Sequence, residues 1–207
     1  MRILILILFL LPNLCFSQLN PQSKKITKKF FPNPNLEIST PAFSKKKGFT
    51  SYNMMMSFIN DLVKDRDDVS LSFIGESQKG KSIPMVKISN DLSDDKLKVW
   101  FQAGMHGNEP ASTEGILYLM QQLLLNDKYS YLFDRLELII IPMVNIDGYE
   151  KNNRYAANGL DLNRDHTKLM IPESNSLKNA FSKYGAEVTV DFHEYTPFRK
   201  DFTKIGD

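Results

Sequence analysis

Two histidines and one glutamate stand where they could hold a metal ion. His106 and Glu109 are three residues apart, and His193 lies far along the chain. Two imidazoles and one carboxylate form the protein ligand set of a catalytic zinc site, whose fourth position is left for water. Gly104 and Gly107 permit the sharp backbone turns that would aim His106 and Glu109 at one point. These residues predict an open, catalytic type of zinc site.

The spacing of these residues does not exclude a purely structural role for each of them. His106 is compatible with a loop histidine, Glu109 with an acid that favours a helix dipole, and His193 with a histidine at a strand end. His166, which follows Asp165, is interpreted as a loop side chain. The His-Glu-x-x-His signature of helix-borne protease sites does not occur in the sequence. The metal-site hypothesis therefore depends on the fold bringing distant segments together.

Apolar segments just before these polar residues have the length and composition of buried strands. Residues 98–103, 136–141 and 187–192 are predicted strands, and a polar cluster follows each one. In open α/β sheets, ligands bind at the carboxyl ends of the strands. We therefore expect the clusters to meet in one crevice; they are residues 106–109, 145–148 and 193–194.

The remaining pattern alternates helices with strands. Apolar residues at helical spacing predict a helix that starts at Tyr52, and its methionines are interpreted as core residues. Alternation over 69–74 and 83–88, with a glycine turn between them, predicts a hairpin. Further helices are predicted at about 109–125 and at 172–184, the second with a proline start and a glycine stop. We expect an α/β domain with a mixed, mostly parallel central sheet flanked by helices.

Residues 1–17 are predicted to be a secretory signal peptide. A basic residue follows Met1, and residues 3–11 form an apolar run that is shorter than the roughly 20 residues of a membrane span. A lipoprotein signal acylated at Cys15 is the second interpretation, because bulky Leu14 fits that cleavage poorly. We expect an exported protein, in the periplasm, at the cell surface or outside the cell, with no transmembrane segment in its mature chain.

Residues 18–50 differ from the rest in charge and proline content. They hold seven lysines and one glutamate, whereas residues 51–207 carry 18 basic and 23 acidic residues. Because prolines and like charges disfavour a regular element, we predict a linker or a strap over the domain surface at 18–50. The acidic body argues against nucleic acid as a partner. One cysteine excludes an internal disulfide, and 42% hydrophobic residues permit a packed core.

A long polar stretch carries several motifs in a fixed order. It contains Asn145-Ile146-Asp147-Gly148-Tyr149, then Arg154, then Asn158-Gly159-Leu160-Asp161-Leu162-Asn163-Arg164. With His-Gly-Asn-Glu-Pro before it and Asp-Phe-His after it, the chain resembles the zinc metallocarboxypeptidases, the carboxypeptidase A-like family. The resemblance covers about residues 51–207 and includes the segment from Phe73 to Pro84. It implies a zinc carboxypeptidase-like catalytic domain with the fold of that family.

The resemblance also implies the ligands of the metal. His106, Glu109 and His193 match the family's zinc ligands, with one zinc ion per chain. Asp161 matches the acid that orients the first zinc histidine, and a carboxylate behind a ligating histidine fixes its tautomer.

Three further residues match the parts of the family site that contact substrate. Arg154 matches the arginine that polarises the scissile carbonyl and stabilises the oxyanion. Asn163 and Arg164 match the pair that grips the free C-terminal carboxylate of a peptide, which a guanidinium fork and a neutral donor suit well. From the residues alone, surface ion pairing remains an alternative for both arginines.

The implied activity is the release of C-terminal amino acids from peptides that have a free terminal carboxylate. Two alternatives stay open: a related zinc amidase, deacylase or cell-wall peptide hydrolase, and a non-catalytic zinc- or peptide-binding fragment. The family places its general base, a glutamate, on a later strand, and Glu194 beside His193 does not match that position. We therefore expect the 207-residue chain to be the N-terminal portion of a longer enzyme and a poor hydrolase by itself.

Overall fold

A computed structural model of the chain describes residues 23–32, 35, 37–45, 47–90 and 95–195. The chain divides into two compact units, the first ending at Glu37 and the second beginning at Ile38. The predicted signal peptide lies outside the described residues. None of the helices in this described part combines the length and the apolar character that crossing a bilayer requires.

The first unit contains a short helix, α2 (Lys24–Phe30). The prediction that residues 18–50 hold no regular element is wrong at this point. Pro32 lies beyond the helix, and the Ser23 side chain caps the first turn by accepting from the Ile26 amide at 3.3 Å. Lysines in the last turn favour the negative end of the helix dipole. The like charges are therefore accommodated by a solvated helix of seven residues.

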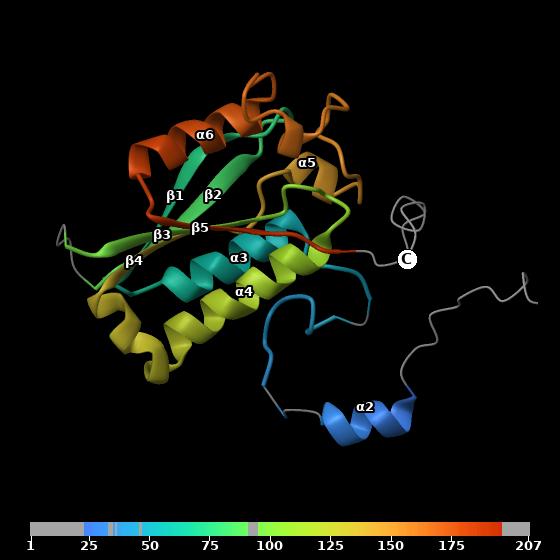
Figure 1. Ribbon diagram of the computed structural model, residues 1–207, viewed down its shortest axis with the longest axis vertical. Helices are drawn as coiled ribbons and strands as arrows, with labels where there is room; N and C mark the ends of the chain where they lie inside the picture. Colours follow the sequence, from blue (N-terminus) through green and yellow to red (C-terminus); the bar gives the residue numbers. More distant parts are fainter. Residues whose placement is uncertain (1–22, 33–34, 36, 46, 91–94, 196–207) are drawn as a thin grey trace, which may run out of the picture. The chain divides into compact units, whose positions relative to one another are not determined.

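The second unit is built on a five-stranded mixed sheet (Figure 1). Its strands are β1 (Val69–Glu76), β2 (Ser82–Ile88), β3 (Leu97–Ala103), β4 (Leu136–Ile141) and β5 (Val188–Phe192), in the spatial order β1-β2-β4-β3-β5. β1 and β2 form the predicted hairpin, and β2 also pairs antiparallel with β4. β3 pairs parallel with both β4 and β5. The predicted mixed sheet is confirmed, and its described pairings divide equally between parallel and antiparallel.

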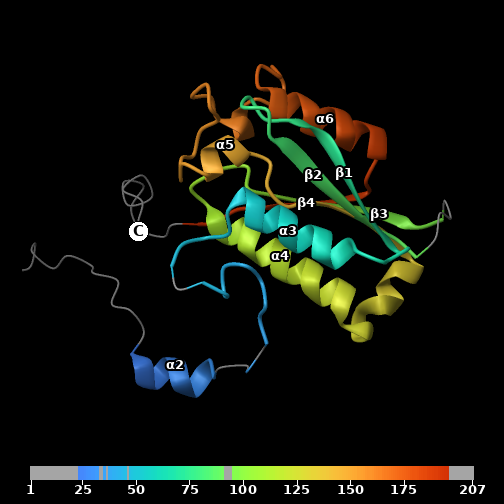
Figure 2. The ribbon, with the colours of Figure 1, turned by 180° about the vertical axis from the view of Figure 1, so that it is seen from behind.

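Helices cover both faces of this sheet (Figures 1 and 2). α3 (Tyr52–Val63) and α4 (Pro110–Leu125) lie against one face, and α6 (Pro172–Tyr184) lies against the other. On the α6 side, the ring of Trp100 meets that of Phe181 edge-on, with 5.5 Å between centroids. On the other side, Met55 of α3 is fully buried, as expected of a core methionine. The central strands β2, β3 and β4 are thus held between two apolar layers, which makes their ends rigid supports. The prediction of a buried strand at 187–192 is wrong in one respect, because β5 lies at the edge of the sheet and is largely exposed.

Besides α2, three short elements of the second unit were not predicted from the sequence. They are η2 (Asp127–Asp134), α5 (Ile146–Tyr149) and η3 (Leu162–Arg164). The buried side chain of Asn145 starts α5 by accepting from the Gly148 amide at 3.0 Å. The stretch between β4 and α6 is therefore a series of tight turns fixed by side chains.

The loops that follow β3 and β4 are joined to each other at the carboxyl edge of the sheet. The Val144 amide donates to the Ala103 carbonyl at 3.0 Å. Gly104 has φ +67°, a conformation that L side chains rarely adopt. A Cβ atom at Gly107 would come within 2.1 Å of the Gly148 carbonyl carbon. These two glycines let the loop after β3 lie directly against the start of α5.

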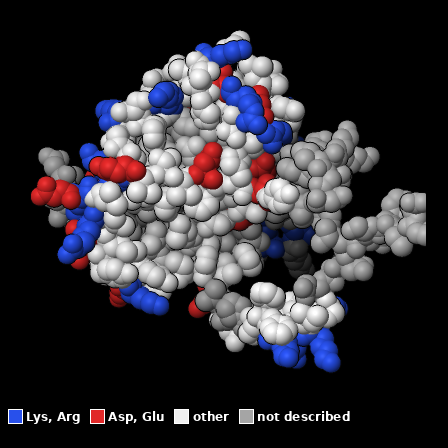
Figure 3. Space-filling view, viewed as in Figure 1, with Lys and Arg blue, Asp and Glu red and all other residues white. Residues whose placement is uncertain are grey.

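Charged side chains are spread over the second unit. On the described part of the face shown in Figure 3, acidic and basic side chains are interspersed rather than gathered by sign. The lysines of α2 form their own group on one side of that helix (Figure 3). The charge contrast seen in the sequence therefore follows the division into units only in part, because four of the seven lysines of residues 18–50 lie in the first unit and three in the second.

Candidate metal centre

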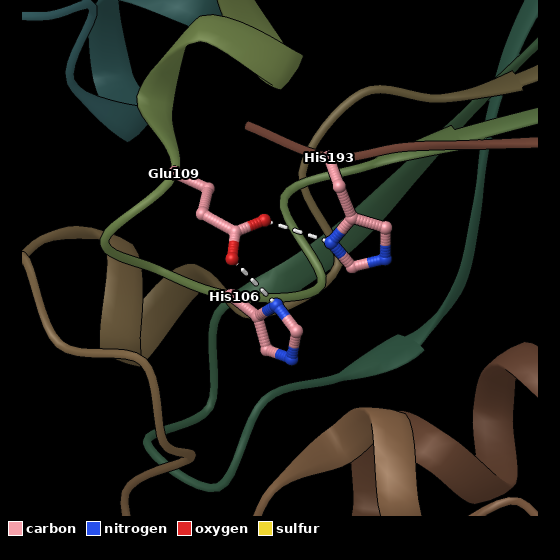
Figure 4. Close-up of side chains that lie close together, drawn as sticks. All are labelled: His106, Glu109 and His193. Carbon is pink, nitrogen blue, oxygen red and sulfur yellow. Dashed lines mark hydrogen bonds and ion pairs between the residues drawn. The ribbon is translucent and has the colours of Figure 1, made fainter. Parts of the chain in front are cut away.

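The three predicted ligands converge at the carboxyl ends of β3 and β5 (Figure 4). His106 comes from the loop after β3, Glu109 directly precedes α4, and His193 follows β5. His106 Nδ1 lies 2.9 Å from Glu109 Oε1, and His193 Nδ1 lies 2.7 Å from Glu109 Oε2. One ligand atom from each residue lies within 4.8 Å of the other two. The parallel pairing of β3 with β5 is what brings these distant positions together.

The Glu109 carboxylate is buried between the two imidazoles. Burial by itself raises the pKa of this carboxyl, but hydrogen bonds from His193 and the Glu194 amide, with the charges of both histidines, bring the pKa below its usual value. The hydrogen bond to Asp191 raises the pKa of His193 to about 9; burial opposes this shift, and Glu109 adds to it. The proton between Glu109 and His193 therefore belongs to His193, which donates it to the ionised Glu109, and a metal cation would take the place of that proton.

Each histidine turns its other ring nitrogen toward an aspartate. His106 Nε2 lies 3.2 Å from Asp161 Oδ1, and His193 Nε2 lies 3.1 Å from Asp191 Oδ2. A carboxylate at Nε2 holds the ring proton there and leaves the lone pair of Nδ1 for a metal. Asp161 lies where the resemblance expects an orienting acid. The sequence reasoning missed Asp191, although an acid two residues before a histidine on a strand lies on the same face of the sheet.

Arg154 lies beside this cluster and is held there by Asp161. Arg154 Nε donates to Asp161 Oδ2 at 3.0 Å, and Nη2 forms an ion pair with the same oxygen at 2.9 Å. Its Nη1 lies 3.3 Å from His106 Nδ1 and 3.5 Å from Glu109 Oε1. Burial raises the pKa of Asp161, but the hydrogen bonds and charges of Arg154 and His106 outweigh it and keep the carboxyl ionised. A fixed cation therefore faces the atoms that would surround the metal.

The predicted carboxylate-binding pair lies on η3, directly after Asp161. The Asp161 side chain accepts from the Asn163 amide at 2.9 Å and so starts this short helix. Arg164 is exposed, and its Nη1 donates to the Asn163 carbonyl at 2.9 Å. His166 lies exposed in the next loop, with Nε2 3.4 Å from Asn163 Oδ1. Asp161 thus connects the histidine–glutamate cluster to the segment expected to bind substrate.

The donor set fits zinc. Catalytic zinc takes three protein ligands from histidine nitrogens and carboxylate oxygens. Here the two Nδ1 atoms face one carboxylate, while both Nε2 atoms are engaged by aspartates. No second cluster of three side chains able to hold a metal ion occurs among the residues that the structure describes. His106, Glu109 and His193 are therefore the residues that would hold the ion.

Comparison with known proteins decides the family. The model of the family described as zinc carboxypeptidase matches residues 55–196, more than half of the chain. The chain belongs to the zinc carboxypeptidase family. The matched span contains the three candidate ligands together with Arg154 and Asp161, and the family consists of zinc-dependent metallopeptidases. The resemblance noted in the sequence is confirmed.

Several curated members of the zinc carboxypeptidase family are similar to this chain. Carboxypeptidase 2 of Trichophyton rubrum is 30% identical over 82% of the chain, which corresponds to 36% of the relative. Carboxypeptidase D of Homo sapiens is 33% identical over 69% of the chain, which corresponds to 12% of the relative. The chain therefore spans about a third or less of the length of these two relatives.

Solved structures support the zinc carboxypeptidase fold. Carboxypeptidase A from Helicoverpa armigera aligns with a TM-score of 0.66 and 21% identity, over 75% of this chain and 50% of that one. A metallo-carboxypeptidase from Burkholderia cenocepacia aligns with a TM-score of 0.65 and 20% identity, over 74% of this chain and 47% of that one. The sheet and its flanking helices therefore correspond to part of the family fold.

Proposed function

We propose that this chain carries the zinc site of an exported metallocarboxypeptidase that releases C-terminal amino acids from peptides. The observation that carries the proposal is the convergence of His106 Nδ1, His193 Nδ1 and the Glu109 carboxylate. The family match supports peptide hydrolysis, and the basic start and apolar run of residues 1–17 support export. Because the chain spans half or less of the relatives described above, zinc binding is proposed for this chain and turnover for the whole protein.

The proposed chemistry is hydrolysis of the terminal peptide bond. Zinc, when bound, supplies a Lewis acid and lowers the pKa of water, so that a nucleophile forms near neutral pH. Arg154 would donate to the scissile carbonyl oxygen as negative charge develops on it. Its Nε and Nη2 are already engaged by Asp161, while Nη1 faces the ligand cluster. One well-placed donor of this kind contributes about 10²–10³-fold to kcat.

The proposed substrate has a free C-terminal carboxylate. Arg164 would receive that carboxylate, because its exposed guanidinium offers a planar fork of donors. Asn163, next to it on η3, would add a neutral donor. A hollow of about 500 Å³ opens beside Gly107 and Pro110, the neighbours of the candidate ligands.

The proposal is tested first by zinc content and then by substrate choice. We expect about one zinc per chain by elemental analysis, and chelator-sensitive release of terminal residues by the whole protein. Arg164→Ala should weaken cleavage of free-acid peptides more than that of amidated ones, because only the free acid loses a charged partner. Lys168→Ala, an exposed cation in the next loop, is the matched control.

Three results would contradict the proposal. A chain without zinc would refute the metal site. Equal losses on free-acid and amidated peptides in Arg164→Ala would favour the amidase or deacylase alternative. A whole protein that binds zinc and peptide without any turnover would favour a binding role.

A further inference from the structure

Helix α4 starts with a capping position whose side chain is used elsewhere. Glu109 is the N-cap residue of α4, and it makes no side-chain hydrogen bond to the helix. An N-cap side chain normally accepts from an amide in the first turn. The Glu109 carboxylate faces His106 and His193 instead. Since Pro110 has no amide proton, the first amide of the helix that needs an acceptor belongs to Ala111.

Glu194 supplies that acceptor from the end of β5. The Ala111 amide donates to Glu194 Oε2 at 3.1 Å. In the opposite direction, the Glu194 amide donates to Glu109 Oε2 at 3.2 Å. A negative carboxylate at this position also suits the positive end of the helix dipole. The two bonds form a reciprocal link, similar to a capping box but made between a strand end and a helix start.

We propose that Glu194 is a positioning residue that fixes the distance between the zinc ligands Glu109 and His193. The inference rests on the proposed function, because it concerns the same site. Glu194 directly follows His193, so its bond to Ala111 holds the His193 backbone against the start of α4. Because Glu194 supplies the acceptor for Ala111, the first turn of α4 does not need the Glu109 carboxylate as its cap. A first turn without this acceptor would compete for the Glu109 carboxylate and draw it away from the histidines.

The opposite end of β5 offers a matched control. Glu187 makes a reciprocal link of the same kind: its amide donates to the Lys98 carbonyl at 2.9 Å, and its Oε2 accepts from the Lys98 amide at 2.7 Å. Loss of Glu187 therefore removes an equivalent backbone link from the same strand, far from the ligands. A purely structural role of Glu194 would give both alanine variants the same behaviour.

The experiment measures zinc affinity of the full chain by competition with a chromophoric chelator, in four variants. Glu194→Ala should weaken zinc binding about 10-fold or more, which is the usual effect of removing a side chain that supports a metal ligand. Glu194→Gln keeps an oxygen acceptor for Ala111 and loses only the negative charge at the helix start, so its zinc affinity should fall about fivefold or less. Glu194→Asp keeps the charge but shortens the reach, and it should resemble Glu194→Ala. Glu187→Ala should bind zinc as the parent does.

A second readout does not depend on zinc. Amide hydrogen exchange of the metal-free chain should become faster at the start of α4 in Glu194→Ala, and not in Glu194→Gln. The inference is overturned if Glu194→Ala binds zinc as tightly as the parent, or if Glu187→Ala loses as much zinc affinity as Glu194→Ala. It is also overturned if Glu194→Asp keeps the zinc affinity of the parent while Glu194→Gln loses it. If Glu194→Ala does not fold, the zinc affinities of Glu194→Gln and Glu194→Asp are compared, and the inference requires the tighter binding in Glu194→Gln. A parent chain that binds no zinc overturns the proposed function together with this inference.

Discussion

Two nitrogens of Arg154 contact a single oxygen of Asp161: Nε donates a hydrogen bond at 3.0 Å, and Nη2 forms an ion pair at 2.9 Å. The other oxygen of Asp161 faces His106 Nε2. One carboxylate therefore sets both the direction of a histidine ring and the orientation of a guanidinium. Because Arg154 is anchored along one edge, its remaining nitrogen Nη1 points at the ligand cluster.

Arg154→Lys is expected to separate catalysis from metal binding. Lysine keeps the positive charge but has no fork with which to hold Asp161 and face the substrate at the same time. Zinc content should stay near that of the parent, while kcat of the whole protein falls by about 10²–10³-fold. Arg135→Lys, at an exposed position before β4, is the control and should change neither value. Unchanged kcat in Arg154→Lys would remove this arginine from the proposed chemistry.

The histidines allow a direct test of the ligand set, since the sequence contains three. His106→Ala and His193→Ala should each abolish stoichiometric zinc binding, because two remaining ligands rarely hold the ion. His166→Ala removes the exposed loop histidine and should leave about one zinc per chain. Elemental analysis after dialysis gives the measurement. Full zinc in both ligand variants, or loss of zinc in His166→Ala, would show that the ligands are assigned wrongly.

The two aspartates behind the histidines should tune zinc affinity to different extents. Asp161→Asn weakens contacts to both His106 and Arg154, whereas Asp191→Asn affects only the partly exposed His193. We expect losses in zinc affinity of about 10–100-fold, larger for Asp161→Asn. Chelator competition measures both.

An aspartate elsewhere in the chain provides the control for these two variants. Asp68 forms a comparable two-bond pair with Arg66, at 2.9 and 2.6 Å, away from the metal centre. Asp68→Asn should leave zinc affinity unchanged. Equal losses in all three aspartate variants would indicate a general effect of charge on the chain rather than support of the ligands.

Much of the fold followed from local chemical signals. The bounds of α6 were predicted correctly because a proline occupies its first turn and Gly185, with φ +67°, ends it in the left-handed conformation. β4 was equally clear because four consecutive apolar residues, 138–141, end at a proline. Where one residue type decides the local conformation, the sequence is sufficient.

The elements that were missed depend on distant contacts. α5 has only four residues, and its start is fixed by the buried Asn145, whose Nδ2 also donates to the Arg154 carbonyl at 3.2 Å. A helix this short has no apolar periodicity from which it could be predicted. The positions of Asp191 and Glu194 beside the metal centre likewise depend on the pairing of β5 with β3 and on the start of α4. The family motifs indicated the ligands, but only the packed structure showed what holds them.

Asp165 provides a test of stability that is independent of the metal. Its buried carboxylate accepts from the Met170 amide at 3.0 Å and from the Ile171 amide at 2.8 Å, which closes the loop before α6. Burial raises the pKa of Asp165, but these two hydrogen bonds, together with the Ser174 side chain and the charge of His166, outweigh it and bring the pKa below the ordinary value. Asp165→Asn places an amide group against one of the two backbone donors. The free energy of unfolding at pH 7 should fall by about 1–3 kcal/mol.

The stability lost in Asp165→Asn should depend on pH in one direction. A carboxyl whose pKa is lower in the folded than in the unfolded chain stabilises the fold above the unfolded value of about 3.9, and the benefit disappears as the pH falls through the folded value. Denaturant unfolding of parent and Asp165→Asn should therefore differ most at neutral pH, and the difference should shrink as the pH falls below about 3.9. Asp134→Asn, at an exposed carboxylate bonded to the Asn90 side chain, should stay close to the parent throughout. A gap between parent and Asp165→Asn that is constant from pH 7 to pH 3 would mean that the ionised form of Asp165 is not what holds the loop.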